Sequence, residues 1–130
     1  MTDVVVDASA ILAFLQREPG SSIVAAAVEQ GTCFVSAVNV AEVLAKLTDS
    51  GMTLEECWVS VRDIELETVA FDAAAAVATA ALRSSTRAAG LSLGDRACIA
   101  LAQSLELPVV TTDRAWRAVP LPVEIIFARP

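Results

Sequence analysis

The sequence predicts an α/β fold in which helices cover both faces of a mostly parallel sheet. Short apolar runs at 4–6, 33–35 and 108–112 are typical of buried parallel strands. Segments with helical periodicity and capping residues separate these runs. Strands that alternate with helices form parallel sheets with right-handed crossovers. With 130 residues and no repeat or linker, the chain is expected to fold as a single domain over residues 1–130.

The first half of the chain alternates strand signals with helix signals. Val40, Val43, Leu44 and Leu47 recur at the spacing of one helix face, and Glu42 lies beside that stripe. Serine is a common cap at helix starts and glycine a common end signal. The expected elements are a strand over 4–6, a helix over 8–15, a helix capped by Ser21 or Ser22 and ending before Gly31, a strand over 33–35, and a helix capped by Ser36 and ending before Gly51.

The second half contains two capping-box patterns. Thr53 precedes Glu56 by three residues, and Ser92 precedes Asp95 by the same spacing. Two prolines before the last apolar run favour an edge position for that strand. The expected elements are a helix from Thr53 to about Val61, a strand over 64–69, one long Ala-rich helix capped by Asp72 and ending near Gly90, a helix from Ser92 to about Leu105, a strand over 108–112 and an edge strand over 123–127.

The composition narrows the possible chemistry. Histidine is absent, which removes the commonest general base, the usual partner of an activated nucleophile and the usual zinc ligand. Hydrolysis by this chain would therefore rely on carboxylates and a metal ion. Cys33, Cys57 and Cys98 are odd in number and lie in apolar surroundings, so we interpret them as buried thiols in a reducing cytoplasm.

Hydrophobic residues make up 55% of the chain, although no apolar stretch is long enough to cross a membrane. This combination indicates apolar surface that is reserved for a partner chain. The formal net charge of −7 argues against binding to nucleic acid. Divalent ions bound to acidic residues would offset part of that charge, and eight of the nine basic residues are arginines, which are good phosphate ligands.

Four carboxylates stand where an α/β fold directs side chains to one crevice. Asp7 follows the first strand, Asp113 follows the strand at 108–112, Asp95 opens a helix and Glu42 flanks a helical stripe. Ligand sites of parallel sheets lie beyond the carboxyl ends of the strands. Because oxygen ligands without nitrogen or sulfur suit hard cations, the pattern predicts an Mg²⁺ or Mn²⁺ site.

Each of these residues also has a purely structural explanation. Asp7, Asp95 and Asp113 can cap helices or begin turns, and Glu42 can form an ion pair with Lys46 on the same helix. The supporting hydroxyls of Ser9 and Thr111 can bond to local backbone instead of facing the site. The remaining candidates have a structural alternative as well, solvated surface for Arg83, Arg87, Arg96, Arg114 and Arg117, and packing for Trp58 and Trp116.

Four segments together resemble the motifs of PIN-domain ribonucleases. They are Val4-Val5-Val6-Asp7-Ala8-Ser9-Ala10, Ser36-Ala37-Val38 to Ala41-Glu42-Val43, Leu91-Ser92-Leu93-Gly94-Asp95-Arg96-Ala97-Cys98, and Val110-Thr111-Thr112-Asp113-Arg114-Ala115-Trp116. Their order and spacing are similar to those of the compact VapC-type toxins, and the resemblance covers essentially the whole chain.

The resemblance implies a PIN-like α/β/α sandwich and an Mg²⁺- or Mn²⁺-dependent endoribonuclease that cleaves RNA by metal-activated water. It also implies a cytoplasmic toxin of a VapBC-type toxin–antitoxin system, a homodimer with a cognate antitoxin protein as partner. By motif, the catalytic and metal-binding acids are Asp7, Glu42, Asp95 and Asp113, and the supporting residues are Ser9 and Thr111. The candidate substrate-binding residues, Arg96 and Arg114, follow two of these acids and could contact phosphates. Some relatives carry a further acid after the fourth motif, where this chain has Arg114 to Arg117, so a second metal position stays open.

Other readings compete with this one. Aspartyl-phosphate phosphatases carry a second Asp two residues after the first, where this chain has Ser9. A phosphoacceptor domain needs a lysine at a late strand end, and the single lysine, Lys46, lies in a helical segment. The alternative that remains is a catalytically inactive PIN-like module that binds RNA or protein.

Overall fold

The computed structural model describes residues 2–129 and contains a central sheet of five strands. Every neighbouring pair is parallel, and the strand order is β3-β2-β1-β4-β5. The predicted α/β/α sandwich is confirmed, with a sheet that is parallel throughout these residues. The strands are β1 (Val4–Val6), β2 (Cys33–Ser36), β3 (Glu67–Val69), β4 (Val109–Thr111) and β5 (Ile125–Phe127).

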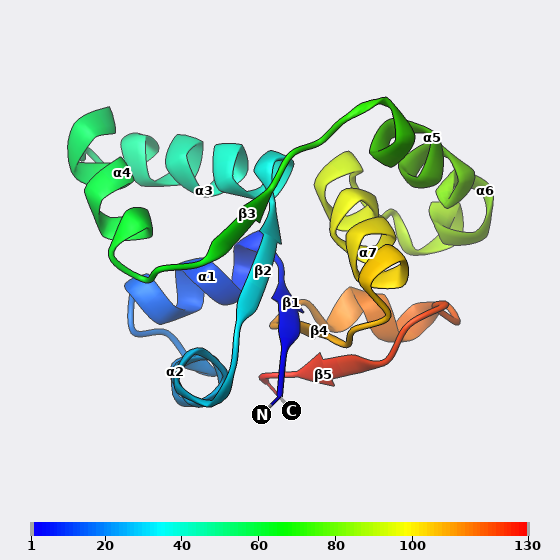
Figure 1. Ribbon diagram of the computed structural model, residues 1–130, viewed down its shortest axis with the longest axis horizontal. Coiled ribbons are helices and arrows are strands. Elements are labelled where there is room, and N and C mark those ends of the chain that lie inside the picture. The colour runs from blue at the N-terminus through cyan, green and yellow to red at the C-terminus, as the bar shows by residue number, and fades with distance from the viewer. Residues whose placement is uncertain (1, 130) are drawn as a thin grey trace.

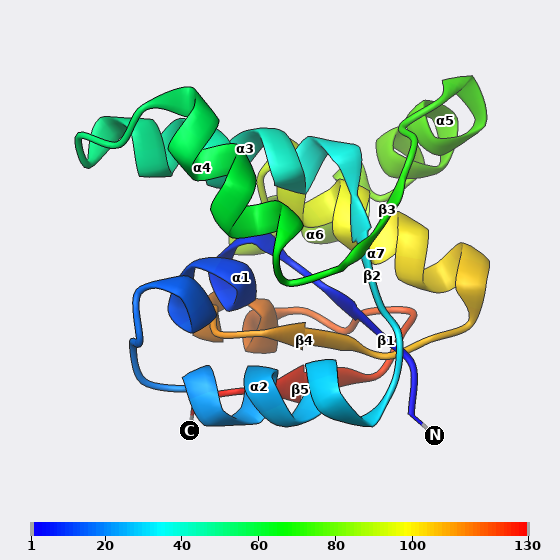
Figure 2. The same ribbon diagram turned by 60° about the vertical axis from the view of Figure 1, so that its left-hand side comes forward.

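Helices cover both faces of the sheet, as Figure 1 shows from one side and Figure 2 after a rotation. Helices α1 to α4 lie on one side and α5 to α7 on the other. The helices are α1 (Ala8–Leu15), α2 (Ser21–Gln30), α3 (Ala37–Asp49), α4 (Leu54–Arg62), α5 (Ala73–Ala81), α6 (Arg83–Thr86) and α7 (Leu93–Leu105), with short 3-10 helices η1 (Arg87–Ala89) and η2 (Arg114–Ala118).

The alternation of side chains along β1 divides the core in two. Val4 and Val6 belong to the cluster beneath α1 to α4, whereas Val5 belongs to the cluster beneath α7 and η2. All three valines are buried, as expected for the central strand of a sheet that is covered on both faces. Pairing of Val5 with Val109 and of Val6 with Val110 brings the carboxyl ends of β1 and β4 side by side.

Three predicted boundaries are wrong for local reasons. Helix α2 begins after Gly20, whose positive φ of 99° turns the chain, so neither Ser21 nor Ser22 is its cap. Only 67–69 of the predicted strand pairs with the sheet. The long Ala-rich helix ends at Ala81 and continues as α6 and η1. The Thr86 hydroxyl donates to the carbonyl of Leu82 at 2.7 Å there, a bond that is common where helices bend.

The predictions about buried cysteines and tryptophans are confirmed except for one tryptophan. The three cysteines are buried and unpaired, as predicted. Trp116, a residue of η2, is buried, but Trp58 on α4 is 46% exposed and is not a core residue. No helix within residues 2–129 is long and apolar enough to span a membrane.

Candidate active site

Asp7 occupies the junction between β1 and α1. It is the N-cap of α1, and its Oδ1 accepts a hydrogen bond of 2.8 Å from the backbone N–H of Ala10. The cap is the structural role that the sequence allowed. The side chain is only 2% exposed, so a carboxylate is enclosed at the carboxyl end of the central strand.

The hydroxyls of Ser9 and Thr111 join the ends of β1 and β4. Thr111 donates to Oδ2 of Asp7 at 2.6 Å, and the Ser9 hydroxyl lies 2.8 and 2.9 Å from the two carboxylate oxygens. The two hydroxyl oxygens are 3.2 Å apart. Both hydroxyls also accept backbone hydrogen bonds, from Thr112 to Ser9 and from Asp113 to Thr111. Both therefore face Asp7, and they fix its orientation from two chain segments.

Asp95 and Asp113 each cap a helix through one carboxylate oxygen. Oδ2 of Asp95 accepts from the backbone N–H of Ser92 at 2.9 Å and completes the predicted capping box. Oδ1 of Asp113 accepts from the backbone N–H of Ala115 at 2.9 Å at the start of η2. In each carboxylate the other oxygen accepts no hydrogen bond from residues 2–129. Capping and a role in the site are therefore compatible.

Glu42 reaches the site from α3 and lies against the first turn of α7. Its Oε1 accepts a hydrogen bond of 2.8 Å from the side-chain amide of Asn39, which also donates to the carbonyl of Gly94 at 3.1 Å. A Cβ atom at Gly94 would overlap Oε1 of Glu42. Within the described chain Glu42 has no ion pair with Lys46, so that structural alternative is wrong.

Electrostatic effects link the acids in pairs, Asp7 with Asp95 and Asp95 with Asp113. Burial, with a smaller contribution from the charge of Asp95, raises the pKa of Asp7 to about 6 despite the opposing effect of its hydrogen bonds. Burial also raises the pKa of Asp95, and Asp113 contributes to that rise. The pKa of Cys98 is raised well above its usual value by burial and by the charges of Asp7, Asp95 and Glu42. The raised pKa keeps the buried thiol of Cys98 protonated.

The donor set fits a hard divalent cation. All the free donors are carboxylate or hydroxyl oxygens. Burial disfavours the charged forms of Asp7 and Asp95, and so does a neighbouring acid, Asp95 for Asp7 and Asp113 for Asp95. A bound cation would relieve this repulsion. Within residues 2–129, no three acidic, cysteine or histidine side chains already surround one point closely enough to hold a metal. The four acids therefore do not form a completed coordination shell in the described residues.

Arginines flank the acids on the side of α7 and η2. Arg96 follows Asp95 directly, is partly buried, and lowers the pKa of that carboxyl by its charge. Arg114 follows Asp113 and is exposed. Arg117 packs on the ring of Phe127, with the guanidinium carbon 4.3 Å from the ring centre, so its role is at least partly structural. Of the three, Arg114 is the most accessible to a ligand.

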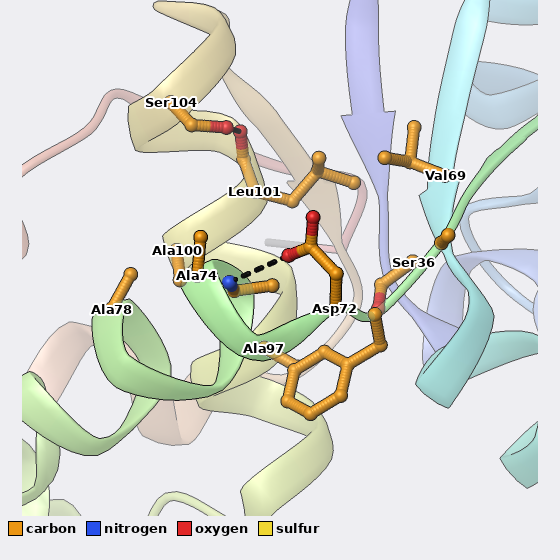
Figure 3. Close-up of a pocket in the computed structure, with 12 residues that line it drawn as sticks. Ser36, Val69, Asp72, Ala74, Ala78, Ala97, Ala100, Leu101 and Ser104 are labelled. Atoms are coloured by element: carbon orange, nitrogen blue, oxygen red, sulfur yellow. Dashed lines mark hydrogen bonds between the residues drawn. The ribbon is translucent and has the colours of Figure 1, made fainter.

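A separate cleft of about 290 Å³ lies between α5 and α7 and does not include the four acids. Figure 3 shows its alanine-rich wall and the carboxylate of Asp72, which points to the backbone of α5. Asp72 is the single titratable residue among those lining the cleft, and it accepts a hydrogen bond of 2.9 Å from Ala75 as the cap of α5. The cleft lacks groups for catalysis, so the candidate site stays at the acids.

Sequence reasoning missed two residues of this site. Asn39 and Gly94 contact Glu42, yet neither was assigned a role. Asn39 is the only asparagine in the chain and lies one helical turn before Glu42, which was an available signal. Gly94 lies inside a helix start, where glycine is unfavourable without a packing reason.

Comparisons with known proteins agree with this architecture. Similar solved structures include VapBC bound to DNA from Salmonella typhimurium (TM-score 0.75, 19% identity, 98% of this chain and 99% of that chain). They also include VapBC2 from Rickettsia felis bound to a promoter DNA fragment (TM-score 0.74, 15% identity, 96% of this chain and 98% of that chain). A third is VapBC-5 from Mycobacterium tuberculosis, a member of the VapBC family of toxin–antitoxin systems (TM-score 0.64, 22% identity, 100% of this chain and 100% of that chain). At these identities the likeness shows the fold.

A search among curated proteins gave no significant match. The sequence profile described as "PIN domain" matches residues 4–121, a span that includes all four acids and both supporting hydroxyls. The protein belongs to the PIN domain family.

Proposed function

We propose that this protein is an Mg²⁺- or Mn²⁺-dependent endoribonuclease and the toxin of a VapBC-type toxin–antitoxin pair in the cytoplasm. PIN domains are generally nucleases, which supports a hydrolase of this kind. The observation that carries the proposal is the enclosed carboxylate of Asp7 at the carboxyl end of β1, which the charge of Asp95 affects and beside which Asp113 follows the paired strand β4. A chain without histidine has no other evident means of hydrolysing a phosphodiester.

The residues that would hold the cation are Asp7, Glu42, Asp95 and Asp113. When bound, a divalent cation supplies the charge that acidifies water and offsets negative charge on the reacting phosphate. The chain supplies the geometry. Ser9 and Thr111 orient the carboxylate of Asp7 through hydrogen bonds of 2.6–2.9 Å. The caps of α7 and η2 hold Asp95 and Asp113 by one oxygen each and leave the other free.

Contacts with the RNA backbone are assigned to Arg96 and Arg114, which follow two of the acids directly in sequence. Exposed arginines bind phosphate oxygens in a bidentate manner. Arg114 is exposed and has no carboxylate within 4 Å among the described residues. Its guanidinium is therefore available to a phosphate beside the acidic cluster.

Exposed apolar side chains support association with protein partners. Leu54, Trp58 and Val59 on α4 are 61%, 46% and 37% exposed, and Val77 on α5 is 72% exposed. Large apolar groups in such positions are common in interfaces. We assign these surfaces to a homodimer and to a cognate antitoxin, by analogy with the toxin–antitoxin structures that share the fold. A protein that remains monomeric by light scattering at tens of micromolar would contradict the dimer.

The direct test is cleavage of RNA by the purified protein with Mg²⁺, with Mn²⁺ and with a chelator. Cleavage that requires the metal, and that Asp7→Asn abolishes, is the expected result. Metal binding without any turnover would instead identify a binding module that does not cut RNA. A short reading frame for a DNA-binding protein directly upstream of this gene would support the toxin assignment independently.

A further inference from the structure

We propose that Asn39 and Gly94 are positioning residues that hold Glu42 in the metal site, an inference that rests on the proposed function. Glu42 is the one acid of the four that does not cap a helix. Its side chain is also long and flexible, so its carboxylate has many rotamers to lose when it is fixed. Something other than local backbone geometry has to place it.

Asn39 supplies the hydrogen bonds that fix the carboxylate. Its amide nitrogen donates to Oε1 of Glu42 at 2.8 Å and to the carbonyl of Gly94 at 3.1 Å. Both partners are acceptors, so the amide cannot be rotated to exchange its nitrogen and oxygen. One side chain of α3 thus ties Glu42 to the backbone of α7, next to Asp95.

The stability of the fold does not explain why a buried asparagine stands at position 39. The residue is 1% exposed, and its Oδ1 has no donor among residues 2–129. A buried acceptor without a donor is unfavourable, and an apolar side chain of similar size would avoid it. The amide is therefore best explained by what its nitrogen holds.

Gly94 supplies the space. A Cβ atom at this position would lie 2.5 Å from Cδ and 2.8 Å from Oε2 of Glu42, in addition to overlapping Oε1. The atoms in the way are the free end of a flexible side chain, so the fold can absorb a methyl group by letting that chain rotate away. Gly94→Ala should consequently displace the carboxylate while it leaves the helix intact or improves it.

The experiment measures binding of Mn²⁺ alone by calorimetry, together with a thermal melt of each metal-free protein. The variants are Gly94→Ala, Asn39→Leu, Glu42→Ala and the double variant Gly94→Ala/Glu42→Ala. We expect each of the first two to weaken Mn²⁺ binding by roughly 10- to 100-fold, the range found when residues that orient metal ligands are replaced. The melting temperature of Gly94→Ala should not fall.

The double variant separates positioning from general damage. Once Glu42 is shortened, the three atoms nearest to a methyl group at Gly94 are gone, so adding Gly94→Ala to Glu42→Ala should change Mn²⁺ affinity by less than about twofold. The control for loss of a buried polar group is Thr79→Val on α5, because the Thr79 hydroxyl is also buried without a partner among the described residues. Thr79→Val should bind Mn²⁺ like the wild type.

Three outcomes would overturn the inference. Gly94→Ala binding Mn²⁺ as tightly as the wild type would show that Glu42 needs no such space. Equal losses from Gly94→Ala with and without Glu42 would show that the methyl group acts through the fold. A wild-type protein that binds no Mn²⁺ would overturn the proposed function together with this inference, whereas in the first two cases the proposed function stands. If Asn39→Leu fails to fold, Mn²⁺ binding by Gly94→Ala still tests the inference.

Discussion

The strand-borne acids and the helix-borne acids of the proposed site are held in place by different means. Asp7 and Asp113 follow β1 and β4, and the parallel pairing of these strands places them on one edge of the sheet. Glu42 and Asp95 come from α3 and α7, which pack against each other on that edge. The first pair is fixed by sheet topology and a network of hydroxyls, and the second by contacts between helices.

This difference predicts different effects of substitutions at the two pairs. Asp7 is fully enclosed, and its hydrogen bonds come from two strand ends that are hard to move. Glu42 is partly exposed, and Asn39 and Gly94 restrain it. We therefore expect changes to the strand-borne pair to alter both stability and activity, whereas changes around Glu42 should weaken metal binding and activity with little effect on stability.

The largest effect should come from Asp7→Asn. The substitution removes the most enclosed carboxylate of the proposed metal site, so RNA cleavage should fall by about a thousandfold or more. Asp49→Asn is a matched control, because Asp49 is an exposed acid at the end of α3. The measurement is the initial rate of cleavage at saturating Mg²⁺. A variant that retains full activity would contradict the mechanism.

Replacing Thr111 by Val should have the next largest effect. The change keeps the shape of the side chain but removes the 2.6 Å hydrogen bond to Asp7 and the acceptor for the Asp113 backbone. We expect Mn²⁺ affinity to fall about 10- to 100-fold. Thr112→Val is the control, since the neighbouring hydroxyl makes no side-chain hydrogen bond within the described residues. Similar losses in both variants would mean that the strand end, and not the hydroxyl bridge, sets the affinity.

The pH dependence of stability should separate the two pairs. Because the pKa of Asp7 is raised to about 6 from 3.8, its neutral form stabilises the metal-free fold below about pH 4, and this contribution is lost as the pH rises through 6. Asp7→Asn should therefore be more stable than the wild type at pH 7, by at most about 3 kcal/mol, with little difference near pH 4. Urea unfolding across this range measures the difference in unfolding free energy.

Asp95→Asn provides the comparison within that experiment. The pKa of Asp95 is also raised, but the carboxylate is less buried and caps α7 through the Ser92 backbone. Its gain in stability at pH 7 should be smaller than that of Asp7→Asn. Mn²⁺ should stabilise the wild type at pH 7 and should stabilise Asp7→Asn far less. Equal gains for the two variants would show that burial does not distinguish the two pairs.

The same distinction explains what sequence reasoning can reach. The strand ends were predictable, because an apolar run followed by Asp fixes a residue at a sheet edge once the strands are parallel. The caps at Ser36, Thr53 and Ser92 were likewise local and are confirmed. That Glu42 contacts Gly94 depends on how α3 packs on α7, and no local pattern encodes the contact between two helices distant in sequence.

The wrong predictions about the Ala-rich helix and Trp58 also concern contacts that local sequence patterns do not encode. The Ala-rich segment 73–89 has high helix propensity at its start, and the polar run Ser84-Ser85-Thr86 lets the chain bend where it packs near η2. The exposure of Trp58 was missed because an aromatic residue in an amphipathic helix is usually buried in the same chain.

The smallest effect should come from the arginines beside the two pairs. Arg114 is exposed next to the strand-borne Asp113, whereas Arg96 is half-buried next to the helix-borne Asp95, with its Nε enclosed. Arg114→Ala should weaken binding of a cleavage-resistant RNA a few-fold and reduce the salt slope by up to about one. Arg96→Ala should change the salt slope less and should remove a charge that lowers the pKa of Asp95.

The control is Arg62→Ala, because Arg62 is an exposed arginine on α4 that pairs with Asp63. This variant should leave the salt slope unchanged. If Arg62→Ala and Arg114→Ala reduce the slope equally, RNA contacts are spread over the surface and are not concentrated beside the strand ends.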